Sequence, residues 1–120
     1  MAKVQVAVKF DPQTLKAYSR NEATMHLVFE SVDSLKQYWC ECEIAMKSPL
    51  SLAGDRELDA GRTRVGIVRP NESKSKQVKI YTRPINFPDS YKVNITTYVY
   101  DDDGTIAERL EQTENIVCEG

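Results

Sequence analysis

Residues 37–46 read Gln37-Tyr38-Trp39-Cys40-Glu41-Cys42-Glu43-Ile44-Ala45-Met46, and this stretch decides the fold class. Apolar and polar residues alternate along it, which is the period of a β-strand with one buried face. The predicted inward face consists of Tyr38, Cys40, Cys42, Ile44 and Met46. A shift of one residue would bury Glu41 and Glu43, and burying unpaired carboxylates costs far more free energy than exposing an indole. The strand therefore directs Trp39, Glu41 and Glu43 outward.

The same alternation recurs on both sides of this stretch, whereas no window keeps helical spacing of apolar residues for three turns. It predicts further strands over residues 4–10, 23–30, 62–69, 77–82, 91–99 and 105–118. Residues 50–61 read as a connector with at most a short edge strand. About seven short strands separated by turns predict an all-β fold, an immunoglobulin-like antiparallel β-sandwich.

Three finer expectations concern the second half of the chain. Residues 62–69 and 77–82 are predicted to pair as a hairpin, with Val65 and Ile67 directed to one side. The last strand is expected to place Ile106 and Leu110 inward and to carry a bulge within residues 111–114, because the middle of that strand is polar. Asp101-Asp102-Asp103-Gly104 predicts a hairpin turn before it, since Gly accepts positive φ angles.

Length and charge narrow the possible functions. A chain of 120 residues fits one domain, residues 1–120, with a single core. Sixteen basic and 18 acidic residues give a net charge of −2, which disfavours nucleic acid as a partner. No segment approaches the roughly 18 apolar residues of a membrane span. The first residues alternate instead of forming an apolar leader, so we expect a cytoplasmic protein, or an extracellular one if a signal peptide has been removed.

Residues 62–110 resemble the second half of CARDB-type immunoglobulin-like modules. The resemblance is carried by Val68-Arg69-Pro70-Asn71-Glu72-Ser73, Val78-Lys79-Ile80, Pro88-Asp89-Ser90-Tyr91-Lys92-Val93 and Tyr100-Asp101-Asp102-Asp103-Gly104. It implies that Tyr91 is a corner tyrosine, whose hydroxyl donates a hydrogen bond to backbone upstream. It also implies a tendency toward adhesive or scaffolding roles.

The cysteines allow two interpretations. Cys40 and Cys42 project to the same inward face, where a free thiol behaves as a small hydrophobe. The alternative is a thiol-dependent or metal-binding protein based on Cys40, Cys42 and Cys118. A zinc site would need more nitrogen or sulfur ligands, and His26 is the single histidine. We expect buried thiols, no metal, no cofactor and no catalytic residue.

The outward face of residues 37–46 is the predicted functional surface. If that strand pairs with residues 91–99, Tyr98 and Tyr100 extend a patch made of Trp39, Glu41 and Glu43, with Arg109 near its edge. Exposed Trp and Tyr are enriched in protein interfaces. The patch predicts a non-enzymatic protein-interaction or scaffolding module whose partner is another protein or a second copy in a homodimer. Two alternatives remain: these aromatic rings stack on sugars in an extracellular adhesion or carbohydrate-binding protein, or the loop over residues 50–61 covers Trp39.

Overall fold

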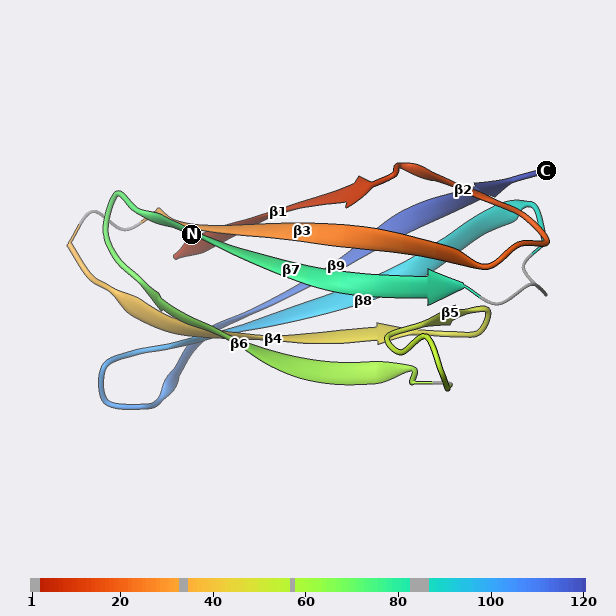
Figure 1. The fold of residues 1–120 in the computed structure, drawn as a ribbon. Helices are drawn as coiled ribbons and strands as arrows, with labels where there is room; N and C mark the ends of the chain where they lie inside the picture. The colour runs from red at the N-terminus through yellow and green to blue at the C-terminus, as the bar shows by residue number, and fades with distance from the viewer. Residues whose placement is uncertain (1–2, 33–34, 57, 83–86) are drawn as a thin grey trace.

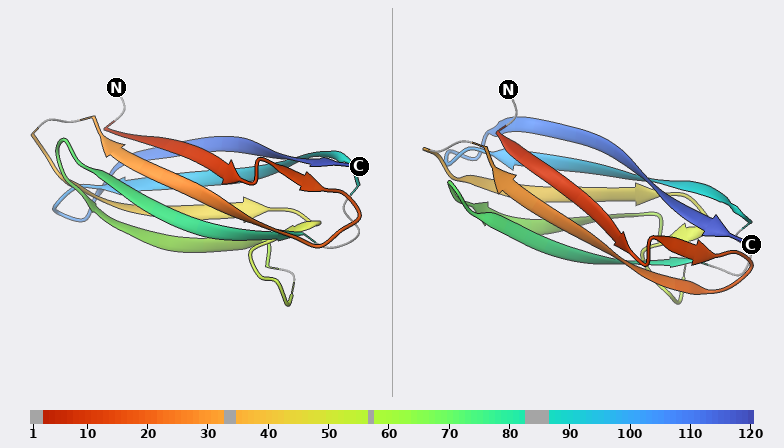
Figure 2. Two further views of the ribbon diagram at one scale, coloured as in Figure 1. Left: turned by 45° about the horizontal axis from the view of Figure 1, so that its top comes forward. Right: turned by 90° about the horizontal axis from the view of Figure 1, so that it is seen from above.

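The computed structural model describes residues 3–32, 35–56, 58–82 and 87–120, and in them two β-sheets pack face to face (Figure 1). Within these residues nine strands form: β1 (Val4–Asp11), β2 (Thr14–Lys16), β3 (Asn21–Ser31), β4 (Tyr38–Met46), β5 (Leu50–Ser51), β6 (Ala60–Val68), β7 (Ser73–Thr82), β8 (Asp89–Tyr100) and β9 (Ile106–Glu119). Sheet A has the order β1-β3-β7-β5, and sheet B has the order β2-β9-β8-β4-β6. The sandwich is elongated, 48 Å by 22 Å by 19 Å along its principal axes (Figure 2).

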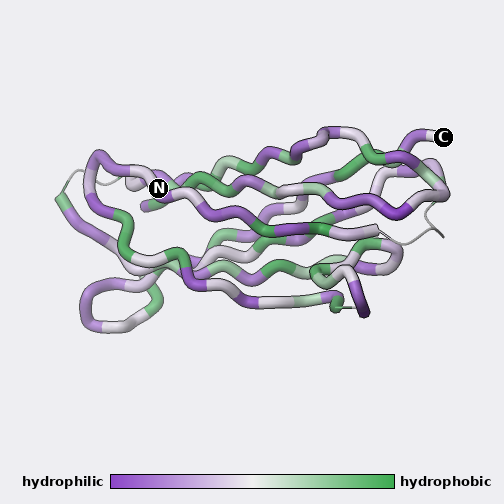
Figure 3. Tube along the Cα trace, viewed as in Figure 1, coloured by the Kyte–Doolittle hydropathy of each residue, from purple (hydrophilic) through white to green (hydrophobic). Residues whose placement is uncertain are grey.

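Alternating side chains of both sheets build one apolar layer between them. In β4 the inward set is Tyr38, Cys40, Cys42, Ile44 and Met46, each at most 3 % exposed. The neighbouring strand β8 adds Val93, Ile95 and Val99 to the same side of sheet B, and β3 faces them from sheet A with Ala23, Met25, Leu27 and Phe29. The hydropathy pattern of Figure 3 shows this alternation along several of the strands. The all-β, two-sheet sandwich and the orientation of the deciding stretch are confirmed.

Two short strands bring the number in the described residues to nine. β2 pairs in parallel with the end of β9, so that Leu15 lies opposite Cys118 and is buried. β5 pairs with β7 at the edge of sheet A. Both strands are shorter than the window over which a two-residue period can be recognised.

The predicted hairpin of residues 62–69 and 77–82 is wrong. β6 pairs with β4 in sheet B, whereas β7 pairs with β3 and β5 in sheet A. The turn between β6 and β7, in which Asn71 has a φ of 60°, therefore carries the chain from one sheet to the other. The turn residues determine only that the chain reverses. Which strands then pair depends on which strand edges are available. Here β8 pairs with one edge of β4, and β6 pairs with the other.

Two β-bulges change which residues face the core. One lies on β6, where the register against β4 shifts between Cys40 and Glu41 and Gly66 adopts a φ of 107°. After it Ile67 points outward and Val68 is buried, so Val65 and Ile67 do not share a side. The other shifts the register of β9 between Val99 and Tyr100. Ala107 then packs on the core, and Ile106 is 58 % exposed rather than inward.

The bulge expected within residues 111–114 is absent, because β9 keeps one register against β8 from Cys118 to Glu108. Its polar middle faces inward instead. Gln112 and Glu114 are half-buried there, and the Gln112 Nε2 donates to the Glu114 carboxylate at 3.2 Å. Within the described residues β1 pairs only with β3, so this side of the sandwich is open and tolerates polar side chains. No helix in the described part of the chain has the length and apolar character needed to span a bilayer.

Candidate contact surface on sheet B

Across β6, β4, β8 and β9, the outer face of sheet B is organised in rows of residues that lie opposite one another. The first row, here called the aromatic row, consists of Ile67, Trp39, Tyr100 and Ile106. Ile67 is 36 % exposed, Trp39 37 % and Ile106 58 %, and Tyr100 is half-buried. Both isoleucines reach this face because of the two bulges. The row therefore joins four apolar side chains from four strands on an outward surface.

The next two rows along the strands are charged. One row holds Arg64, Glu41, Tyr98 and Arg109, and the other holds Arg62, Glu43, Thr96 and Glu111. All five residues predicted to form the contact surface thus lie on this one face: Trp39, Glu41, Glu43, Tyr98 and Tyr100. The assumption behind that prediction, that β4 pairs with β8, is confirmed.

Arg62 connects all three rows through its side chain, and it was not predicted from the sequence as part of the surface. Its Nε donates to the Glu41 carboxylate at 3.0 Å, and its Nη2 donates to the Tyr100 hydroxyl at 2.8 Å. The guanidinium carbon lies 4.5 Å from the centroid of the Tyr98 ring, a cation–π distance. The signal was the alternation Arg62-x-Arg64, which places two cations outward. These cations were not connected with Glu41 from the sequence, because residues 62–69 were predicted to pair with residues 77–82. In the structure they belong to β6, the neighbour of β4.

Glu41 is the acceptor at the centre of this network. The Trp39 indole Nε1 donates to its Oε2 at 3.0 Å, while Arg62 binds its Oε1. The indole hydrogen bond and then the Arg62 guanidinium lower the pKa of the Glu41 carboxyl below its ordinary value. The polar groups around the aromatic row are therefore satisfied within the sheet, and the apolar parts of the rings are left facing outward.

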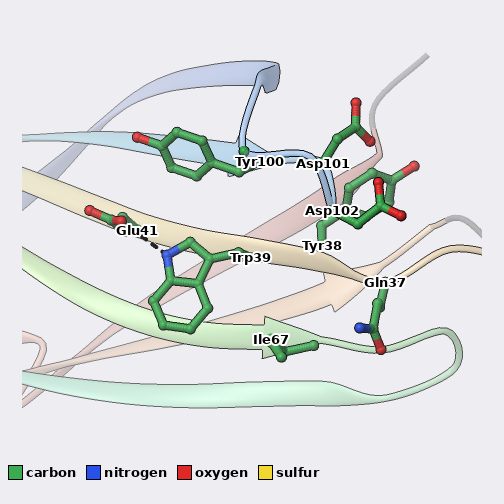
Figure 4. Close-up of a pocket in the computed structure, with 9 residues that line it drawn as sticks. Gln37, Tyr38, Trp39, Glu41, Ile67, Tyr100, Asp101 and Asp102 are labelled. Carbon is green, nitrogen blue, oxygen red and sulfur yellow. Dashed lines mark hydrogen bonds between the residues drawn. The ribbon is translucent and has the colours of Figure 1, made fainter.

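Beside the aromatic row lies a depression of about 430 Å³. Figure 4 shows Trp39 between Ile67 and Tyr100, with Asp101 and Asp102 at the end of β8. The turn that follows is held together by the Asp103 carboxylate, which accepts hydrogen bonds from the Thr105 amide and hydroxyl at 3.1 Å and 2.7 Å. The predicted hairpin turn is confirmed, and Gly104 has a φ of 85° there.

The loop after β5 does not cover Trp39. Ser51 is buried, and its hydroxyl oxygen lies 2.9 Å from the carbonyl oxygens of both Ala53 and Arg56, which share its one proton, and accepts hydrogen bonds from the amides of Ala53 and Leu58. The loop is thus tied to the strand at the edge of sheet A. The alternative in which residues 50–61 cover the indole is wrong for the residues that the structure describes.

The cysteines lie away from this surface. Cys40 and Cys42 are free and buried, as predicted, and Cys118 is a buried thiol. Burial raises the pKa of the Cys40 thiol to about 12 and that of the Cys42 thiol to about 11, because a thiolate would lose its hydration. Within the described residues, no group of three or more His, Cys, Asp or Glu side chains is arranged to hold a metal ion. His26 lies on β3 in the other sheet, opposite Lys9 and Gln77.

Tyr91 has the geometry of a corner tyrosine. It lies near the start of β8, and its hydroxyl donates to the Phe87 carbonyl oxygen at 2.6 Å, four residues upstream. Its ring packs on the core. The hydrogen bond that the CARDB resemblance implied is therefore present, although tyrosine corners also occur in other sandwiches.

No family model and no curated protein sequence matches the chain. Its fold is similar to that of Spo0M, a sporulation control protein from Bacillus subtilis, with a TM-score of 0.53 and 10% identity over 100% of this chain. The chain spans about half of that structure, 51% of its length. It is also similar to BslA, a bacterial hydrophobin, with a TM-score of 0.55 and 7% identity over 99% of this chain and 97% of BslA. A third similar structure is ApaA from Bordetella pertussis, with a TM-score of 0.55 and 12% identity over 96% of this chain and 91% of that one. At these identities the likeness shows the fold alone.

Proposed function

We propose that this chain is a non-enzymatic protein-interaction module that uses the outer face of sheet B as its contact surface, and that a second copy of the chain is a partner. The observation that carries the proposal is the aromatic row. Of the eight large apolar residues that are exposed in the described part of the chain, three lie in this one row. Scattered exposed apolar residues are normal, but a contiguous set with a polar border is typical of an interface.

The chemistry of the surface supports a protein partner more than a sugar. Arg62 lies over the Tyr98 ring, and it also binds the Tyr100 hydroxyl. The Trp39 indole N–H is held by Glu41. Sugar recognition relies on open ring faces together with polar groups that are available to bind hydroxyls. Here Arg62 covers the Tyr98 ring, and the Trp39 N–H and the Tyr100 hydroxyl are both engaged within the sheet. Glu41 and Glu43 instead form part of the charged border beside an apolar centre.

A thiol-dependent function has little support. Nucleophilic or redox chemistry needs an accessible thiolate. Cys40 and Cys42 are 0 % exposed, and their raised pKa values keep them protonated at neutral pH. The proposal includes the expectation that the chain is a CARDB-type module with a scaffolding role. The Tyr91 corner supports this expectation only for the fold.

Sedimentation velocity of the wild type and of Trp39→Ala, over a range of protein concentrations, tests the proposal. The wild type is expected to self-associate, and Trp39→Ala is expected to weaken association by about 2 kcal/mol, the scale of an interface hot spot. The variant should unfold at nearly the wild-type temperature, because the indole lies outside the core.

Phe87→Ala is the matched control, since Phe87 is also an exposed aromatic residue, at 63 %, but packs on Tyr18 instead of on sheet B. It should leave association unchanged. A wild type that stays monomeric, or association that is lost in Phe87→Ala and kept in Trp39→Ala, would contradict the proposal.

A further inference from the structure

The free edges of the two sheets differ in how well they are protected against pairing with another strand. Proteins block such edges with bulges, lysines or charged side chains that point toward the core. On β6, the bulge next to Gly66 distorts the edge. On β9, Glu108 and Glu114 lie opposite buried residues of β8, so both carboxylates are on the inward side. Both edges of sheet B are therefore protected.

In sheet A, the edge of β7 is protected and the edge of β1 is not. Lys74 and Lys76 of β7 lie opposite buried residues of β3, so they too are on the inward side. β1 keeps one register against β3 along its whole length, without a bulge. Its inward side chains are all apolar: Val4, Val6, Val8 and Phe10. β1 forms the upper edge of sheet A in Figure 1, and β2 lies beyond its end, against residues 117–119 of β9, so the described residues leave the edge of β1 uncovered.

The hydrogen bonds to β3 determine which backbone groups of β1 point to the free edge. The Val32 amide donates to the Lys3 carbonyl oxygen at 2.9 Å, and the register continues unchanged from there to Asp11. In an antiparallel pair, residues that bond to the partner strand alternate with residues whose N–H and C=O point away from it. The odd-numbered residues therefore bond to β3. The groups that point to the free edge belong to Val4, Val6, Val8 and Phe10.

The residues of β1 are self-complementary about Ala7. Two copies can lie antiparallel with Ala7 opposite Ala7, and each Val6 then lies opposite the second copy's Val8. At the two ends, Val4 lies opposite Phe10. Every N–H and C=O group of the free edge is then hydrogen-bonded across the pair. Val6 and Val8, which are half-buried in one copy, cover each other.

Other registers suit this strand less well. In the register about Ala7, the outward Gln5 lies opposite the second copy's Lys9, and no like charges meet. Moving the second copy by two residues in one direction puts Lys9 opposite Lys3, and like charges directly opposite each other are unfavourable. Moving it in the other direction puts Val4 opposite Pro12, which has no N–H to donate. A strand that pairs this completely with itself favours a second copy of the chain over an unrelated segment.

We infer that two copies of this chain pair antiparallel through β1, with a two-fold axis at Ala7, and join their A sheets into one continuous sheet. Main-chain hydrogen bonds to an added strand supply the affinity, and each pair of opposite residues on either side of the axis occurs twice. The Lys3 amide donates to the Glu108 carboxylate at 3.0 Å, so this carboxylate lies at the start of β1. The axis at Ala7 places the two copies of Glu108 at opposite ends of the contact, about 27 Å apart along the strands. The inference does not rest on the proposed function, because the edge of β1 is separate from the aromatic row.

Charge changes at Gln5 test the register. Gln5→Glu places opposite charges against the second copy's Lys9 at both contacts, and Gln5→Lys places like charges there. Sedimentation equilibrium at low salt should find the dimerisation constant about threefold tighter for Gln5→Glu and about threefold weaker for Gln5→Lys. Within one copy Gln5 lies opposite Glu30, so Gln5→Lys favours the folded monomer. A weaker dimer in that variant therefore cannot result from lost stability.

Ala7→Lys tests the position of the axis, and Ser75→Lys is its matched control. Ala7→Lys brings two ammonium groups together at the axis and should weaken the dimer by at least threefold. Ser75 is exposed on the same face of sheet A, in the same row as Ala7, with Val28 of β3 between them. Ser75→Lys adds the same charge away from the edge and should leave the dimerisation constant unchanged. Far-UV circular dichroism and a thermal melt verify the fold of each variant.

Amide hydrogen exchange measured by NMR identifies the paired groups directly. Between about 50 μM and about 1 mM protein, exchange should slow at the residues whose amides point to the free edge: Val4, Val6, Val8 and Phe10. The amides of Gln5, Ala7 and Lys9 bond to β3 in the monomer and should keep their rates. Association through the outer face of sheet B would not produce this alternation.

All of these measurements use the Trp39→Ala background, so that contacts through the aromatic row contribute little. If this protein stays monomeric up to about 1 mM, or if the even-numbered amides of β1 exchange at one rate at every concentration, the pairing through β1 is overturned. A tighter dimer for Gln5→Lys than for Gln5→Glu would exclude the register about Ala7. None of these outcomes changes the test of the proposed function, which compares Trp39→Ala and Phe87→Ala with the wild type.

Discussion

Thiol labelling of the native protein provides a quantitative test of the buried strand β4. A rise in pKa from 9.0 to about 12 lowers the thiolate fraction of Cys40 at neutral pH about 1000-fold, and the rise to about 11 lowers that of Cys42 about 100-fold. Both side chains are also 0 % exposed, so the reagent must wait for an opening of the sandwich. Cys118 lies near the end of β9, against the three-residue strand β2, where opening needs fewer broken contacts.

We therefore expect no rapidly reacting thiol with Ellman's reagent at neutral pH, and three in concentrated urea. Tandem mass spectrometry of partly labelled protein should find Cys118 modified before Cys40 and Cys42. The rate at the two buried positions should rise with pH, because deprotonation increases the thiolate. Labelling of Cys40 or Cys42 at the rate of a free cysteine peptide would refute the buried assignment and reopen the thiol-dependent function.

Two further changes test the corner and the network. Tyr91→Phe removes the 2.6 Å hydrogen bond to the Phe87 carbonyl and should lower the free energy of unfolding in urea by about 1 kcal/mol. The control is Tyr98→Phe, because the Tyr98 hydroxyl has no partner among the described residues, and it should change this free energy little. If the two variants lowered it equally, Tyr91 would not be a corner tyrosine. Folding lowers the pKa of Glu41 from 4.5, so its contacts stabilise the fold above about pH 4.5 and are lost as the pH falls through the folded-state value. Arg62→Met should raise the Glu41 pKa measured by NMR titration, and an unchanged value would exclude the Arg62 contact in solution.

The sequence predicts those features of the fold that depend on a local period. The faces of β1, β3, β4, β7 and β8 follow from alternation, because each strand has one side against the core and a one-residue slip would bury charge. The Asp101–Gly104 turn follows from local chemistry, whereas the Tyr91 corner was implied by the resemblance to CARDB-type modules. The pairing of β6 does not, since Pro70 and Asn71 specify a reversal but not the sheet that the chain enters afterward. β2 and β5 carry too few residues to show a period.

The candidate site was predicted where it depends on β4 and β8, and Arg109 of β9, expected near its edge, lies opposite Tyr98. Trp39, Glu41, Glu43, Tyr98 and Tyr100 were placed on one face by parity, and the structure agrees. Arg62, Ile67 and Ile106 were missed, because their positions depend on the neighbours of that pair and on bulges. A bulge inserts one residue into one strand only, so the hydrophobic pattern of a single strand cannot distinguish it from a change of face.

The two bulges explain how an apolar row comes to lie on the outside of this sandwich. Val65 is the extra residue on β6, because it has no partner on β4, and without it Ile67 would point into the core. On the opposite flank, the extra residue Ala107 has the same effect on Ile106. Both register shifts occur at the same level along the central pair, next to Trp39 and Tyr100. Gly66 permits its φ of 107° because it lacks a Cβ, and a side chain there would strain the backbone although there is space for it. Bulges cluster where a sheet redirects side chains for function, and two of them flanking one tryptophan mark this row as the surface to test.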